Sequence, residues 1–104
     1  MFTRTVRAPL KPGQGDAFTH LIEQKVLPIL QKQKGFRDEV LLISGDGKES
    51  IGVSSWERQE DAEAYDRAAY AEVKKLMEPF LTAPPTLHTY NVALSTVHAT
   101  VGRK

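Results

Sequence analysis

Apolar residues recur in this chain with strand-like alternation in some segments and with helical spacing in others, and the two patterns divide it into six segments. Short segments rich in β-branched residues predict strands, and the GDGK sequence at residues 45–48 predicts a tight hairpin turn between two of them. The expected elements are a strand over residues 2–8, a helix from residue 16, strands over residues 36–44 and 50–56, a helix within residues 57–81 and a strand over residues 86–97.

The first helical pattern follows the turn-forming sequence LKPGQGD and is carried by Phe18 and Ile22. Asp16 is the expected N-cap, because its carboxylate can accept a hydrogen bond from a free backbone N–H. Pro28 removes one backbone donor and crowds the preceding turn, so we expect a kink there. Leu27, next to the proline, and Leu30, two residues after it, are expected to leave the stripe set by Phe18 and Ile22.

Residues 57–81 carry the most regular pattern and predict a single amphipathic helix that ends before the APP sequence at residues 83–85. The apolar positions at spacings of three and four are Ala62, Tyr65, Ala69, Val73, Leu76 and Phe80. On a helical wheel centred on Ala62, Tyr65 and Tyr70 fall on opposite flanks of the buried face.

The order βαββαβ predicts a ferredoxin-like α+β fold in one domain over residues 1–104. Right-handed crossovers and two-layer packing place both helices on one face of a four-stranded antiparallel sheet. The VLLI sequence at residues 40–43 puts apolar residues on both faces of its strand. We therefore expect a homodimer in which two sheets pack face to face as an α/β barrel, with residues 95–101 reaching the partner. The alternative is that Leu41 and Ile43 form a small exposed patch.

The composition excludes several classes of function. Lys and Arg number 14 against 13 Asp and Glu, so no broad basic field favours nucleic acid or a membrane surface. The chain has no cysteine, which excludes disulfides, thiolate catalysis and cysteine-ligated zinc. Its beginning is too polar for a signal peptide and no apolar run approaches a membrane span, so we expect a cytoplasmic protein. His20 is expected on the solvated helix face, and His88 and His98 are too far apart to share a metal ion, so no metal site is expected.

The order of elements and four short sequences resemble the antibiotic biosynthesis monooxygenase family. These are LP before GF (residues 27–28 and 35–36), the strand GVSSW leading into a helix near Glu60, and the closing LHTYNV. The resemblance implies a dimeric α+β barrel with a cavity between the sheet and the helices of each subunit. Some members oxidise polycyclic phenols with molecular oxygen and no cofactor, related members degrade haem, and others are quinol oxidases or have no assigned activity.

This chain departs from the family pattern at positions that matter for chemistry. Relatives that work without a cofactor carry an asparagine four residues before the strand tryptophan, where this chain has Gly52. Many relatives carry histidines on the second helix near the positions of Tyr65 and Tyr70. The Asn, Trp and His set of the haem-degrading branch cannot be assembled here, which disfavours haem degradation.

If the chain resembles this family in function, the candidate catalytic residues are Tyr65, Asp66 and Tyr70, and the candidate substrate-binding residues are Trp56, Gly52 and Phe18. The three rings of Trp56, Tyr65 and Tyr70 can gather at one end of the layer between helix and sheet, although packing alone also accounts for them. Asp66 lies within the helical stripe, so it either faces a cavity as a general base, pairs with Arg67, Arg4 or Arg7, or keeps its carboxylate in water at the rim.

Two functions follow. The first is a monooxygenase or oxidase that acts without a cofactor on a phenolic, quinol or polyketide-like aromatic small molecule. The protein would supply a dry pocket, a base and orienting rings, and the substrate would reduce oxygen. The second is a non-catalytic dimeric module that binds a hydrophobic small molecule, which the glycine at position 52 and the missing histidines favour.

Overall fold

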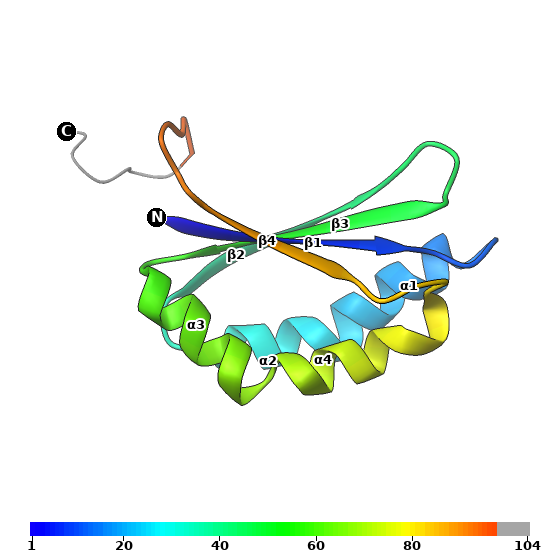
Figure 1. Ribbon diagram of the computed structural model, residues 1–104, viewed down its shortest axis with the longest axis horizontal. Coiled ribbons are helices and arrows are strands. Elements are labelled where there is room, and N and C mark those ends of the chain that lie inside the picture. Colours follow the sequence, from blue (N-terminus) through cyan, green and yellow to red (C-terminus); the bar gives the residue numbers. More distant parts are fainter. Residues whose placement is uncertain (98–104) are drawn as a thin grey trace.

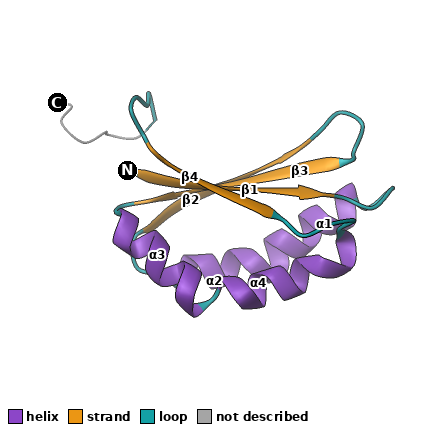
Figure 2. Ribbon diagram, in the orientation of Figure 1, coloured by secondary structure: helices purple, strands orange, loops and turns teal. Residues whose placement is uncertain are grey.

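The computed structural model describes residues 1–97, which form a four-stranded antiparallel sheet with all of its helices packed against one face (Figure 1, Figure 2). The strands are β1 (Phe2–Pro9), β2 (Phe36–Ile43), β3 (Glu49–Trp56) and β4 (Thr86–Asn91), in the order β2-β3-β1-β4. The predicted βαββαβ fold is therefore confirmed. The last strand is shorter than expected and ends at Asn91. His98 and the end of the tail expected to reach a partner lie outside the described residues.

The first helical segment consists of α1 (Gly15–Leu21), a π-helical turn (Ile22–Val26) and α2 (Leu27–Gln31). Its buried residues recur at every fourth position: Phe18, Ile22, Val26 and Leu30. In a continuous α-helix these positions would drift by about 120° around the axis. The wider π turn, which ends two residues before Pro28, slows that rotation and keeps them on one face. The expectation that Leu30 leaves the stripe is wrong for this reason, whereas Leu27 is half-buried.

The start of this segment also differs from the expectation. Gln14, not Asp16, occupies the N-cap position, and no side chain there caps the helix by a hydrogen bond. Asp16 lies in the first turn, where a negative charge still interacts favourably with the helix dipole.

The second helical segment is broken where the sequence predicts one helix. It consists of α3 (Gln59–Ala68), α4 (Tyr70–Met77) and a 3₁₀ turn (Glu78–Phe80). Between α3 and α4, Ala69 has φ −135° and ψ −18°, outside helical geometry. Tyr65 and Tyr70 would lie about 140° apart on a continuous helix. The break changes the phase, so both tyrosines are buried and their ring centroids are 6.2 Å apart, not on opposite flanks.

The register of the sheet separates a helix-facing side from an open side. Glu39 and Leu41 of β2 face the helices, and Ile43 lies near Gly15 at the start of α1. The open side instead carries Val40 and Leu42, which are 49% and 51% exposed. The expected exposed patch of Leu41 and Ile43 is therefore placed on the wrong face. Residues paired with Val40 and Leu42 extend the open apolar surface across β3, namely Val53 and Ile51.

None of the helices among residues 1–97 is both long enough and apolar enough to cross a bilayer.

Candidate functional site

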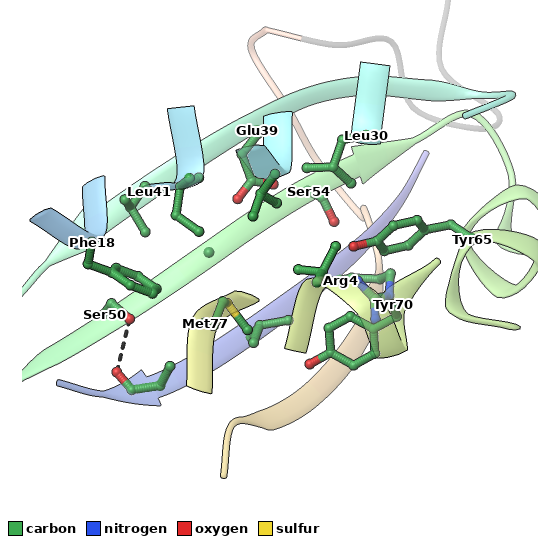
Figure 3. Close-up of a pocket in the computed structure, with 16 residues that line it drawn as sticks. Arg4, Phe18, Leu30, Glu39, Leu41, Ser50, Ser54, Tyr65, Tyr70 and Met77 are labelled. Carbon is green, nitrogen blue, oxygen red and sulfur yellow. Dashed lines mark hydrogen bonds between the residues drawn. The ribbon is translucent and has the colours of Figure 1, made fainter. Parts of the chain in front are cut away.

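A cavity of about 50 Å³ lies between the sheet and the helices (Figure 3). Its walls are mostly apolar and come from both helical segments and from β1, β2 and β3. At one end lie Phe18, Leu41 and Met77, and at the other the polar groups Arg4, Glu39, Ser54, Tyr65 and Tyr70 converge (Figure 3). The volume holds water molecules but is smaller than the roughly 300–1,000 Å³ of typical ligand pockets, so an aromatic ligand requires side chains to move apart.

Arg4 of β1 organises the polar end. Its guanidinium is almost fully buried, and burying a charge is unfavourable unless it is paired. Three contacts compensate it: Nη2 lies 2.9 Å from Oδ1 of Asp66, and the guanidinium carbon lies 4.9 Å and 4.5 Å from the ring centroids of Tyr65 and Tyr70. Arg4 therefore holds α3 and α4 against β1 through one ion pair and two cation–π contacts.

Trp56 supports the site from behind. It is completely buried, its Nε1 donates a hydrogen bond of 2.9 Å to the Ser54 hydroxyl, and it is absent from the cavity lining. Its ring stacks on Tyr65 at 5.2 Å and meets Phe36 edge-on at 5.6 Å. Trp56 thus fixes the position of Tyr65, which lines the cavity itself and points its hydroxyl into it (Figure 3).

Both cavity tyrosines stay neutral at physiological pH. Burial raises the pKa of Tyr65 well above its usual value, and the nearby Arg4 charge opposes this only in part. Burial also raises the pKa of Tyr70, again against the effect of Arg4. These phenols can therefore donate hydrogen bonds to a ligand, but they are not available as anionic bases.

Asp66 does not line the cavity. Its carboxylate accepts the hydrogen bond from Arg4, and its side chain is 44% exposed. Asp66 instead lines a separate hollow between α3 and β4, together with Phe2 and Leu87. Of the three possibilities that the sequence left open, Asp66 does not face the cavity: it pairs with Arg4 and also keeps its carboxylate partly in water. Phe18 and Gly52, the other two predicted substrate-binding residues, do line the cavity.

Glu39 is the ionisable cavity residue that sequence reasoning missed. Its carboxylate lies over Gly52. A Cβ atom added at position 52 would lie 3.0 Å from Oε2 of Glu39. Burial raises the pKa of Glu39 to about 7, with Arg4 lowering it and Asp38 raising it further. Strand alternation is the sequence feature that could have identified it, because it places Glu39 on the same face as Leu41. The apolar VLLI run and a bulge between Phe36 and Asp38 make the register of this strand hard to predict.

Among residues 1–97 no three His, Asp or Glu side chains lie close enough together to hold a metal ion. His20 is exposed on the first helical segment, as expected.

No protein-family profile and no curated protein matches the sequence. Solved structures do match. The ActVA-Orf6 monooxygenase of Streptomyces coelicolor, solved with nanaomycin D, has a TM-score of 0.79 and 20% identity over 94% of this chain and 92% of its own. A Bordetella bronchiseptica protein described as a candidate antibiotic biosynthesis monooxygenase has a TM-score of 0.75 and 20% identity over 89% and 97%. Protein Rv0793 of Mycobacterium tuberculosis has a TM-score of 0.72 and 17% identity over 91% and 97%. The chain therefore has the α+β fold of antibiotic biosynthesis monooxygenase structures.

Proposed function

We propose that the chain is a member of the antibiotic biosynthesis monooxygenase family that oxidises a phenolic, quinol or polyketide-like aromatic molecule with molecular oxygen and without a cofactor. The observation that carries this proposal is the cavity, where apolar walls lead to a polar end formed by Arg4, Glu39, Tyr65 and Tyr70. A flat aromatic molecule with a hydroxyl group fits such a cavity, with its rings against the apolar walls and its hydroxyl at the polar end. The fold likeness to a monooxygenase that holds nanaomycin D supports the same substrate class.

The reaction balances without an added reductant. A phenol loses its hydroxyl proton and a ring hydrogen, gains one oxygen atom to become a quinone, and the second oxygen atom leaves as water. The electrons that reduce oxygen all come from the substrate. Removing the hydroxyl proton raises the electron density of the ring, which favours reaction with oxygen. In this proposal Arg4, which lies against the rings of Tyr65 and Tyr70, supplies a positive charge for the resulting anion, and the hydroxyls of these two lining residues orient it.

The second candidate function is a binding module without catalysis. Such a module either holds a small hydrophobic molecule or has a cavity filled by its own side chains, and the free volume of about 50 Å³ favours the second form. Glycine at position 52 favours it too, since no amide extends from β3 into the cavity. Either function is compatible with the fold, because one scaffold can carry many activities.

We further propose that the protein is a homodimer. The open face of the sheet carries Val40, Leu42 and Tyr90 at 49%, 51% and 55% exposure, and no helix among residues 1–97 covers it (Figure 2). Packing two such faces together as a barrel would bury these side chains.

Oxygen consumption tests the catalytic proposal. The protein is screened for ligands among phenols, naphthoquinols and anthrones by thermal shift, and each ligand is then tested in an oxygen electrode. We expect oxygen uptake with at least one phenolic ligand, and a Tyr65→Phe variant that still binds this ligand but turns it over more slowly. Binding without oxygen uptake by any ligand supports the binding module instead.

A further inference from the structure

We propose that Glu39 is the general base of the cavity and that its carboxylate takes the hydroxyl proton of an un-ionised aromatic alcohol. This assignment rests on the proposed function and replaces Asp66 in the role of base. It also narrows the substrate class to molecules that enter with the hydroxyl proton still attached.

The backbone positions Glu39 for this role. Glu39 pairs with Ser54 across β2 and β3, and both side chains face the cavity. Because Gly52 has no side chain, the carboxylate has room to lie over β3 toward the space that Arg4 and Tyr65 also face (Figure 3). Within residues 1–97 this carboxylate has no hydrogen bond and no ion pair within 4 Å. A half-buried carboxylate that faces a mostly apolar cavity with unused acceptor capacity is suited to a donor supplied by a ligand.

The charges around Glu39 favour a proton exchange with a bound hydroxyl. Among residues 1–97, Arg4 on β1 is the cation that acts on Glu39, Tyr65 on α3 and Tyr70 on α4 are neutral, and Asp38 precedes it on β2. The first helical segment contributes only apolar residues to the lining. When the O–H bond breaks, its proton moves to a Glu39 oxygen and the electron pair stays on the substrate oxygen. One negative charge thus faces Arg4 before and after the transfer, so the step creates no additional buried charge.

Asp66 is poorly placed for the same step. Its carboxylate is engaged by Arg4 at 2.9 Å, is partly exposed and lies outside the cavity lining. Its role is to hold Arg4 in position, which makes Asp66 a positioning residue.

Binding of a model phenol at two pH values tests the assignment independently of turnover. The probes are α-naphthol and its methyl ether, which has the same ring system but no hydroxyl proton, and affinity is measured by calorimetry at about pH 6 and about pH 8. If the ionised carboxylate accepts the hydroxyl hydrogen bond, affinity for α-naphthol rises up to about tenfold across this range, following ionisation of a group with a pKa of about 7. The methyl ether shows no such rise.

The variants separate Glu39 from other carboxylates. Glu39→Gln abolishes the rise, and Glu39→Asp, which keeps a titrating carboxylate, retains part of it. The control Glu57→Gln, an exposed residue paired with Arg37, retains all of it. A rise that persists in Glu39→Gln, an equal rise with the methyl ether, or failure of α-naphthol to bind at all would overturn the proposal.

Oxygen uptake then separates this proposal from the proposed function. If the wild type turns over a phenol, the acid limb of its kcat/KM profile near pH 7, which reports the ligand-free enzyme, must disappear in Glu39→Gln. A Glu39→Gln variant with unchanged kcat and an unchanged profile refutes the base while leaving the monooxygenase intact. Absence of uptake together with the predicted binding profile refutes the monooxygenase while leaving Glu39 as the acceptor of the ligand hydroxyl.

Discussion

Replacing Glu39 with glutamine should change how the stability of the protein depends on pH. The pKa of Glu39 rises from 4.5 to about 7 on folding, because burial penalises the ionised carboxylate more than Arg4 stabilises it. The folded state therefore holds this proton more tightly than the unfolded chain. The stability associated with that proton is fully present below the unfolded pKa of 4.5 and is lost as pH rises through about 7.

The size of the effect follows from the shift. A rise of about 2.5 pKa units at 1.36 kcal/mol each amounts to about 3 kcal/mol of stability lost by the wild type between acid and mildly alkaline pH. Glutamine has a similar shape and no charge to bury, so the variant does not suffer this loss. For a domain of this length the difference corresponds to a Tm change on the order of 10 °C.

The assay is thermal unfolding of both proteins at several pH values between about 4 and 8. The difference in Tm between Glu39→Gln and wild type should be small at the acid end and should grow in favour of the variant through about pH 7. Other titrating groups cancel in this difference because both proteins share them. The exposed control Glu57→Gln should show a small difference at every pH, since surface ion pairs contribute about 0 to 1 kcal/mol. A constant difference between Glu39→Gln and wild type would refute the reasoning.

The sequence predicts the fold well because strand alternation and helical spacing are properties of whole segments. The turn at residues 45–48 illustrates this: Gly47 has φ +72° and Asp46 accepts hydrogen bonds from the Ser44 hydroxyl and the Lys48 N–H, as a GDGK hairpin requires. Errors appear where a helix changes its phase. A wheel with a constant 100° per residue cannot foresee the π turn before Pro28 or the break at Ala69.

The break at Ala69 also limits how well the sequence predicts the site. The sequence pattern places Tyr65 and Tyr70 on opposite flanks of one helix, and the break between α3 and α4 brings their rings together. Glu39 was missed because it lies next to an apolar run that gives no clear inward face, and its partner Gly52 was interpreted as a missing amide. The contact of a side chain on one strand with a glycine on the next depends on register, which a single sequence does not specify.

Two further predictions concern the scaffold. Gly35→Ala should lower the free energy of unfolding in denaturant by about 2 kcal/mol or more, because φ is +80° and the added Cβ would collide with the Asp61 carboxylate. The control Gly47→Ala, at φ +72°, meets no neighbour and should lower it by about 1 kcal/mol. Equal losses in the two variants would contradict the collision. Leu42→Lys on the open sheet face should convert a dimer of about 23 kDa into the 11.6 kDa monomer in light scattering, while Ala71→Lys on the exposed face of α4 leaves the dimer intact. A monomeric wild-type protein at micromolar concentration would refute the dimer.

The most direct test of the central claim is the stoichiometry of oxygen uptake by the purified protein with a phenolic ligand that it binds. The account predicts that one molecule of oxygen disappears for each molecule of phenol converted to quinone, without any added reductant, and that Tyr65→Phe lowers the rate while binding persists. Tight binding of phenols with no oxygen consumption would contradict the monooxygenase and leave a binding module.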